Sequence, residues 1–175
     1  MLLYGASGTG KTSLIQCGLA NKFKETRWKD IFIRREQNIN DSIEKVLQNE
    51  VQISGAFALG NAENEVERLE LLYKVLFKPI YLIFDQFEEL FIIDASEKEQ
   101  EKFFNFIKDL LQSKVAVKVI LIMREEFIAQ LSNFEKKIPT LFDHRYRIEP
   151  MRYSKGEEVI EKTLNRLAED HEIIV

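Results

Sequence analysis

Residues 2–13 read LLYGASGTGKTS, and this stretch decides the fold. Residues 5–12 within it match the pattern G-x-x-x-x-G-K-[ST], in which a glycine-rich loop leaves a strand and delivers a lysine and a hydroxyl residue to a helix start. Apolar Leu2 to Tyr4 predicts that strand, and Leu14 to Phe23 predicts the helix. These flanking elements disfavour the alternative of a glycine-rich turn that binds nothing.

The loop has the chemistry of a phosphate-binding site. Its glycines let successive backbone N–H groups turn inward, and the helix N-terminus adds partial positive charge. Lys11 would neutralise the outer phosphates of a nucleotide, and the Thr12 hydroxyl would ligate Mg²⁺. The predicted nucleotide-binding residues are Gly5, Ala6, Ser7, Gly8, Thr9, Gly10, Lys11, Thr12 and Ser13.

The composition is that of a globular protein. A length of 175 residues suits one domain, 1–175, and a hydrophobic fraction of 45% with a charged fraction of 31% excludes disordered and fibrous classes. The net charge of −4 gives no general attraction to nucleic acid or to anionic membranes. No uncharged apolar run approaches the roughly 20 residues of a membrane helix, and we expect a cytoplasmic protein without a membrane segment in this stretch.

Cysteine and histidine usage narrows the chemistry further. The single cysteine, Cys17, excludes an internal disulfide and fits a reducing cytosol; its place in the first helix predicts a small core residue rather than a reactive thiol. His144 and His171 are the only histidines, and neither has metal-ligating neighbours in the sequence. Zinc chemistry and a serine triad are therefore disfavoured.

The rest of the chain alternates strands with helices. Apolar runs predict strands over Ile31–Ile33, Ile80–Phe84, Val115–Met123 and Arg145–Ile148. Periodicity and capping patterns predict helices over Asp41–Val51, Glu65–Phe77, Ser96–Leu111, Glu125–Asn133 and Ser154–Ala168, with a loop over Ser54–Asn64. Because parallel strands need crossover connections, which helices usually supply, this order predicts an α/β parallel sheet. Functional groups then lie at the carboxyl ends of the strands.

Three of the predicted helices, including the one after the loop, carry more specific expectations. Asp41 with Glu44, and Ser96 with Glu99, have the spacing of a capping box. The first helix is expected to reach about Lys24. Its sheet-facing side would comprise Leu14, Ile15, Gly18 and Leu19, and the inward side of the helix after Ser96 would comprise Phe103, Phe106, Ile107, Leu110 and Leu111.

A second motif, IYLIFDQFEEL over residues 80–90, supplies acids beside the predicted phosphates. Asp85 ends an apolar strand and is the predicted Mg²⁺ residue, acting through a bound water. Glu88 and Glu89 follow at helical spacing and are candidates for the general base, with Glu88 preferred. The alternative for both is an ordinary acid in the first turn of a helix.

A third motif, VILIMREEF over residues 119–127, ends its strand with Arg124. If this strand lies between the strand before the loop and the Asp85 strand, Arg124 faces the γ-phosphate and distinguishes a diphosphate from a triphosphate. The alternative is a salt bridge with one of three acids, Glu88, Glu125 or Glu126.

Two further features bear on the ligand. Arg34 and Arg35 also follow a strand, but they read first as solvated surface residues. The N-K-x-D pattern that reads guanine is missing from any plausible position, since Asn21-Lys22 is followed by Phe23-Lys24. We therefore expect an adenine nucleotide, ATP or ADP.

Together the three motifs resemble the STAND class, signal-transduction ATPases with numerous domains. The closest resemblance is to the bacterial branch whose Walker B segment reads DQFEELF, here residues 85–91, with LIMREEF at 121–127 and Pro150-Met151 before a helix. The resemblance implies a three-layer P-loop NTPase sandwich with a five-stranded sheet of order 5-1-4-3-2. It also implies a nucleotide-controlled switch that carries effector and sensor domains and assembles into oligomers in its ATP state.

The resemblance assigns a role to each motif. The loop would bind phosphate, Thr12 and Asp85 would hold Mg²⁺, and Pro150 would approach the nucleotide where a lid begins. Lys11, Glu88, Glu89 and Arg124 would form the catalytic set. Two positions depart from the family pattern: Gln86 stands where AAA-type motors keep a catalytic glutamate, and Ile148 stands where a glycine often precedes the proline.

These expectations combine into a slow ATPase switch of a signalling or defence protein, which forms a homo-oligomer through its full-length chain. Because the first strand begins at residue 2, we expect a domain taken from a longer chain. One alternative is an AAA-type motor or remodeller, against which the acidic charge balance argues. The other is a scaffold that keeps ATP without hydrolysing it, for which Gln86 is the motivating residue.

Overall fold

At the centre of the computed structural model, which describes residues 1–19, 27–92, 95–150 and 161–162, is a five-stranded parallel sheet. Its strands are β1 (Leu2–Gly5), β2 (Lys29–Arg34), β3 (Ile80–Asp85), β4 (Val117–Arg124) and β5 (Arg145–Arg147). They lie in the order β2-β3-β4-β1-β5, which is the predicted order 5-1-4-3-2 counted from the opposite edge. The fold class expected from the sequence is confirmed.

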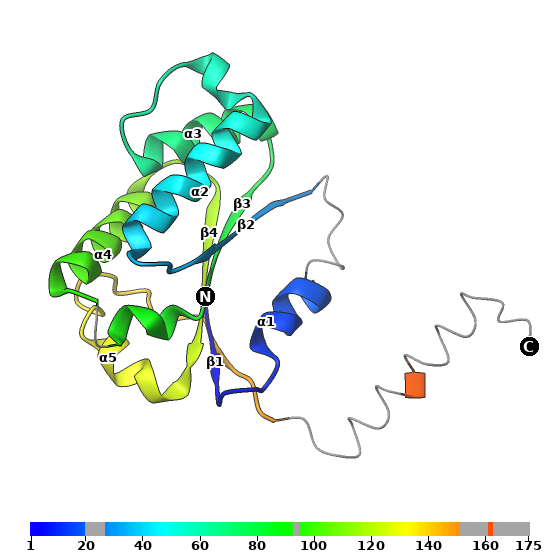
Figure 1. Cartoon of the computed structure of the whole chain (residues 1–175), viewed down its shortest axis with the longest axis vertical. Coiled ribbons are helices and arrows are strands. Elements are labelled where there is room, and N and C mark those ends of the chain that lie inside the picture. The colour runs from blue at the N-terminus through cyan, green and yellow to red at the C-terminus, as the bar shows by residue number, and fades with distance from the viewer. Residues whose placement is uncertain (20–26, 93–94, 151–160, 163–175) are drawn as a thin grey trace, which may run out of the picture.

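Helices cover both faces of the sheet and complete three layers (Figure 1). One face carries α1 (Lys11–Ser13), which continues as the π-helix η1 (Leu14–Leu19). The longer helices on the other face are α2 (Ile39–Ser54), α3 (Glu65–Leu76) and α4 (Glu97–Gln112), followed by α5 (Ile128–Ser132). Short 3-10 turns are η3 (Ala56–Leu59), η4 (Phe87–Phe91) and η5 (Glu125–Phe127).

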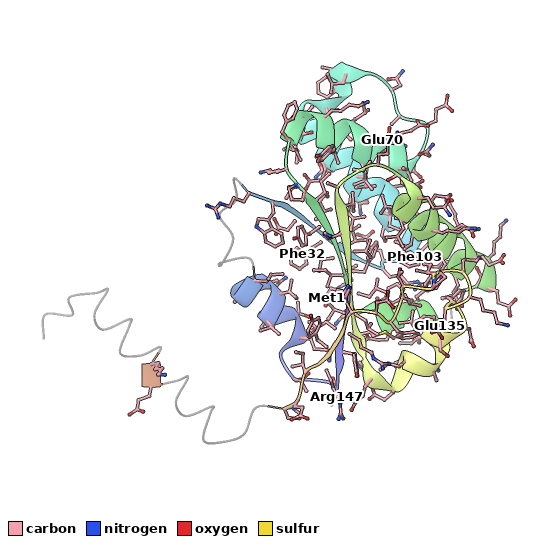
Figure 2. All side chains as sticks on the ribbon, turned by 180° about the vertical axis from the view of Figure 1, so that it is seen from behind. Met1, Phe32, Glu70, Phe103, Glu135 and Arg147 are labelled. Carbon is pink, nitrogen blue, oxygen red and sulfur yellow. The ribbon has the colours of Figure 1, made fainter. Side chains whose placement is uncertain are left out.

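Alternation along the central strands divides the core into two parts. Ile83 and Phe84 are successive residues of β3, so their side chains point to opposite faces of the sheet. Both side chains are fully buried. Ile83 joins a small cluster under α1, whereas Phe84 joins the large core under α2 to α4. Figure 2 shows Phe32 and Phe103 on these two opposite sides of the sheet. The prediction of a strand buried on both faces is confirmed.

The first helix differs from its predicted form. Only Ile15 of the expected apolar face is buried, and Leu14 is exposed. A π-helix closes i→i+5 hydrogen bonds, so the 3.6-residue spacing used for the prediction does not hold there. Cys17 is exposed, so the prediction that it is a core residue is wrong. The π-helical spacing is again the reason. The predicted continuation to Lys24 enters residues 20–26, which are outside the described part of the chain.

Two further predictions need correction, and a third is largely untested. The capping box at Asp41 is wrong: α2 begins at Ile39, and the Asn38 side chain accepts a hydrogen bond from the Asn40 N–H. The predicted loop over residues 54–64 contains the turn η3. The final helix, expected over residues 154–168, falls outside the described residues except for 161 and 162, which are helical.

The inward face of α4 includes a residue that periodicity misplaced. Leu111, predicted to be inward, is exposed, and Phe104 is buried instead. Phe104 stacks on Phe134 with ring centroids 3.8 Å apart, because the irregular segment before β5 folds over this side of the helix. Among the described helices, none combines the length and apolar character needed to cross a bilayer.

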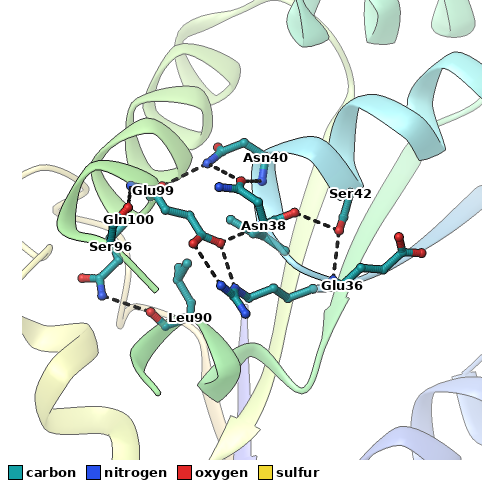
Figure 3. Close-up of polar contacts among 10 residues, drawn as sticks. Glu36, Asn38, Asn40, Ser42, Leu90, Ser96, Glu99 and Gln100 are labelled. Carbon is teal, nitrogen blue, oxygen red and sulfur yellow. Dashed lines mark hydrogen bonds and ion pairs between the residues drawn. The ribbon is translucent and has the colours of Figure 1, made fainter. Parts of the chain in front are cut away.

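A buried polar network joins α2 to α4 (Figure 3). Ser96 caps α4 as predicted, accepting a hydrogen bond of 3.1 Å from the Glu99 N–H. The Glu99 carboxylate does not return to Ser96 but accepts hydrogen bonds from the Arg35 guanidinium at 2.8 and 3.1 Å and from the Ile39 N–H at 2.7 Å. Arg35, predicted to be a solvated surface residue, has only 12% of its side chain exposed. Glu99 thus serves as a cap for the N-terminus of α2.

The Glu99 carboxyl is held in its ionised form. Burial alone would raise its pKa, but hydrogen bonds from Arg35 and the Ile39 amide, together with the Arg35 charge, outweigh burial and lower the pKa below its usual range. A carboxyl whose pKa is lower in the folded state stabilises the fold above its unfolded pKa, and this contribution is lost as the pH falls through the folded pKa.

We expect Glu99→Gln to lower the free energy of unfolding by about 3 kcal/mol at neutral pH, because it removes the buried carboxylate that compensates Arg35. The variant should also lose less stability than the native chain between neutrality and acid pH. Urea unfolding at several pH values measures both effects. Glu36→Gln is the matched control, since its ion pair with Lys45 is exposed and should be worth at most about 1 kcal/mol. Equal loss in both variants would contradict the assignment.

Candidate functional site

The carboxyl ends of the strands surround a cavity of about 360 Å³. Residues from all three sequence motifs line it together. The lining residues are Ser7, Gly8, Gly10, Lys11, Thr12, Ser13, Asp85, Gln86, Glu88, Ile122 and Arg124. Segments far apart in the sequence therefore meet where the parallel sheet predicts functional groups.

The loop between β1 and α1 has the backbone of a phosphate cradle. Gly8 and Gly10 have φ angles of 76° and 78°, in the left-handed region that favours glycine. A Cβ atom at either position would meet nothing within 4 Å, so the loop needs glycine at these positions for its backbone conformation and not for lack of space. Lys11 Nζ donates hydrogen bonds to the carbonyl oxygens of Gly5 at 3.0 Å and Ala6 at 2.7 Å, which places its ammonium over the loop.

Gly5 is required for a different reason, which is close approach of the backbone. A Cβ atom at this position would lie 2.3 Å from the carbonyl oxygen of Ile148. The Ile148 N–H donates to the Tyr4 oxygen at 2.7 Å and extends the pairing of β5 with β1 by one residue. The chain leaving β5 therefore passes directly against the first glycine of the loop.

Thr12 and Asp85, the two predicted Mg²⁺ residues, are in direct contact. The Thr12 hydroxyl donates a hydrogen bond of 2.7 Å to Asp85 Oδ1. Asp85 is only 6% exposed, and its other oxygen accepts from Arg34. Hydroxyl and carboxylate oxygens are the hard donors that Mg²⁺ prefers. With the cradle alongside, the residues present fit a magnesium ion bound to a nucleotide.

Glu88 and Arg124 form an ion pair across the same cavity. Arg124 Nε lies 3.1 Å from Glu88 Oε1, and the Arg124 backbone N–H donates to Glu88 Oε2 at 3.2 Å. Strand β4 lies between β1 and β3, as the prediction for Arg124 required. Arg124 thus makes the salt bridge considered as its alternative while also lining the cavity.

The turn η4 explains why Glu88, rather than Glu89, faces the cavity. Phe87 and Leu90 are buried, and the Phe87 ring packs 5.0 Å from that of Phe103. Gln86, at the start of the turn, has a left-handed φ of 54°. With its neighbours fixed in the core, the buried Glu88 lines the cavity, whereas Glu89 is not among the lining residues.

Some predicted site residues stand outside this lining, and one important residue was missed. Ala6 and Thr9 shape the loop through a hydrogen bond from Thr9 Oγ1 to the Ala6 oxygen, and Pro150 is exposed without lining the cavity. Arg34 is exposed over 55% of its side chain, as its prediction as a surface residue requires, but its guanidinium also contacts Asp85. The sequence offered a signal for this contact, because Arg34 and Asp85 each stand at the end of a predicted strand and the expected strand order places these two strands side by side.

Comparison with known proteins identifies the domain. Residues 1–172 match the family model described as Novel STAND NTPase 1. The chain belongs to this family. The match spans almost the whole chain, and the STAND resemblance of the sequence motifs is confirmed. No curated protein matches the chain. Family and fold together identify a nucleotide-binding NTPase domain.

Solved structures similar to the STAND NTPase domain share its fold. The ORC1 protein of Aeropyrum pernix in complex with DNA superposes with a TM-score of 0.60 at 18% identity, over 94% of this chain and 43% of its own. The Aeropyrum pernix ORC2 protein (ADPNP-ADP complexes) gives 0.53 at 16% identity, over 84% and 40%. Cdc6p of Pyrobaculum aerophilum gives 0.54 at 17% identity, over 91% and 41%. The chain thus spans less than half the length of each.

We expect Gly5→Ala to lower the free energy of unfolding by about 1–3 kcal/mol, because the new methyl group would displace the Ile148 carbonyl or the start of the loop. Thermal unfolding measures this effect. Gly18→Ala is the control, since its Cβ would meet only the flexible Leu14 side chain at 3.3 Å. If Gly5→Ala proved as stable as the control, the packing of Ile148 against the loop would be refuted.

Proposed function

We propose that this STAND NTPase domain binds ATP with Mg²⁺ and hydrolyses it slowly, as the nucleotide-controlled switch of a longer signalling protein. The observation that carries the proposal is the hydrogen bond between Thr12 and Asp85 in the cavity lined by Lys11. A phosphate-loop hydroxyl, a phosphate-loop lysine and a strand-end carboxylate are the three groups that a magnesium–triphosphate complex requires.

The loop residues bind the phosphates. The N–H groups around Gly8 and Gly10, together with the helix start at Lys11, attract the phosphate oxygens. Lys11 exchanges its bonds to the Gly5 and Ala6 carbonyls for the outer phosphates. Thr12 and Asp85 hold Mg²⁺, which supplies neutralisation of phosphate charge when bound.

The pairing of Glu88 with Arg124 gives a physical reason for slow hydrolysis. A carboxylate whose two oxygens are held by a guanidinium and by a backbone N–H is not free to orient a water molecule for attack. A γ-phosphate offers Arg124 a competing anion across the same cavity. When Arg124 turns toward that phosphate, Glu88 becomes available to orient the attacking water. Arg124 then distinguishes a triphosphate from a diphosphate by binding the γ-phosphate, and Glu88 acts as the base.

Family membership supports a proposal for the wider context of the switch. The ORC2 relative is an ADPNP-ADP complex, which favours an adenine nucleotide here as well. We propose that residues 1–175 form one cytoplasmic domain of a longer chain, with flanking effector and sensor domains. A homo-oligomer forms in its ATP state, and Pro150 approaches the nucleotide where a lid begins.

Lys11→Ala should weaken binding of ATP in the presence of Mg²⁺ by about 10- to 100-fold, because it removes a charge-assisted contact with the phosphates. It should also abolish ATP-dependent self-association of the full-length chain. Calorimetry measures the first effect and analytical ultracentrifugation the second. Lys45→Ala, on the exposed face of α2, is the control. ATP-driven assembly that persisted in Lys11→Ala would refute the switch.

A non-hydrolysing scaffold is the second candidate, and one observation favours it. Gln86 follows Asp85 directly and lines the cavity, but an amide cannot accept a proton from water as a carboxylate does. Under this reading ATP is a structural ligand, and the Glu88–Arg124 pair is a fixed part of the site.

Single-turnover hydrolysis followed over hours separates the two functions. For the switch, we expect slow conversion of bound ATP to ADP, reduced by about 100-fold or more in the double variant Glu88→Gln/Glu89→Gln. Glu89→Gln alone should behave like the native chain, since Glu89 does not line the cavity. Intact ATP after hours in the native chain would favour the scaffold instead.

A further inference from the structure

We propose that Arg34 is a positioning residue that competes with Mg²⁺ for Asp85 and so sets the magnesium concentration at which the site loads nucleotide. This inference rests on the proposed function. It concerns a residue outside the three sequence motifs, which reaches the site from the edge strand β2 and does not line the cavity itself.

Strand geometry places Arg34 beside Asp85. The two residues are partners in the register of the parallel strands β2 and β3. In-register residues of parallel neighbours point to the same face of the sheet, here the face of α1 and the loop. Arg35, one residue on, lies toward the other face and bonds Glu99. Alternation therefore divides two adjacent arginines between the nucleotide site and the helical layer.

Both oxygens of the Asp85 carboxylate are engaged. Oδ1 accepts from Thr12 at 2.7 Å, and Arg34 Nη2 lies 2.5 Å from Oδ2. A carboxylate that is 6% exposed needs a compensating positive charge, and Arg34 provides it. Mg²⁺ at Thr12 and Asp85 would provide the same compensation. The magnesium charge would then make the Arg34 charge unnecessary and would repel the guanidinium.

Arg34 is able to leave. Its side chain is 55% exposed, so the guanidinium regains water when it releases Asp85. Arg35, by contrast, is only 12% exposed, so its guanidinium could not regain water in the same way if it released Glu99. Binding of Mg²⁺ therefore carries the cost of breaking one charge-assisted contact, and this cost raises the magnesium concentration that the site requires.

The test measures nucleotide binding as a function of free Mg²⁺. A fluorescent N-methylanthraniloyl ADP is bound to the full-length chain, and the Mg²⁺ concentration at half-maximal signal is compared between the native chain and Arg34→Gln. We expect a half-point about five- to tenfold lower in Arg34→Gln, because the competing cation has been removed. Lys29→Gln, at the opposite end of β2, removes the same charge far from the site and should leave the half-point unchanged.

The outcomes separate this inference from the proposed function. An unchanged or higher half-point in Arg34→Gln, with normal Mg²⁺-dependent binding in the native chain, would overturn the role of Arg34 alone. A native chain that binds no nucleotide at any Mg²⁺ concentration would overturn the proposed function and the competition together. A half-point lowered equally in Lys29→Gln would reduce the effect to net charge and would also overturn the role of Arg34.

A stability measurement covers the case in which Arg34→Gln folds poorly. Without Arg34, added Mg²⁺ supplies the missing positive charge beside Asp85, whereas in the native chain it only replaces one cation by another. The rise in Tm on addition of Mg²⁺ alone should therefore be larger for Arg34→Gln than for the native chain. It should vanish in Arg34→Gln/Asp85→Asn, which has no carboxylate to compensate. An equal rise in the native chain and in Arg34→Gln would count against competition.

Discussion

The site depends on a carboxylate buried at the end of a strand. A charge in that position is stable only when other groups compensate it, and Asp85 is compensated by the Thr12 hydroxyl on one oxygen and the Arg34 guanidinium on the other. These contacts tie three separate segments together: the phosphate loop, the β3 end and the edge strand β2. The geometry of this side of the cavity follows from satisfying this one charge.

Two layers of hydrophobic packing hold the carboxylate in place. The strand before Asp85 is covered on both faces, by the small cluster that includes Ile83 and by the large core that includes Phe84. Beyond Asp85, Phe87 and Leu90 fix the turn η4 in the core and direct Glu88 toward Arg124. The aromatic residues of the DQFEELF segment therefore have a mechanical role, because they orient the acids between them.

The sequence predicted the features that depend on local pattern, namely the loop, the strands, their order through the family resemblance, and the meeting of Thr12 with Asp85. It failed where the outcome depends on a neighbour distant in the sequence. Arg34 and Arg35 have the sequence pattern of surface residues. The strand order places Arg34 beside Asp85, and the packing of α4 on the other face of the sheet places Arg35 beside Glu99. The π-helix was missed because its hydrogen bonding leaves no trace in a pattern read at 3.6 residues per turn.

The contact between Gly5 and Ile148 has a mechanical consequence. The carbonyl of Ile148 leaves no room for even a methyl group at Gly5, so the chain emerging from β5 and the root of the phosphate loop are in hard contact. Hard contacts transmit displacement in either direction. A shift of the chain at the end of β5 would thus displace the first glycine of the loop, and a shift of the loop would displace the end of β5.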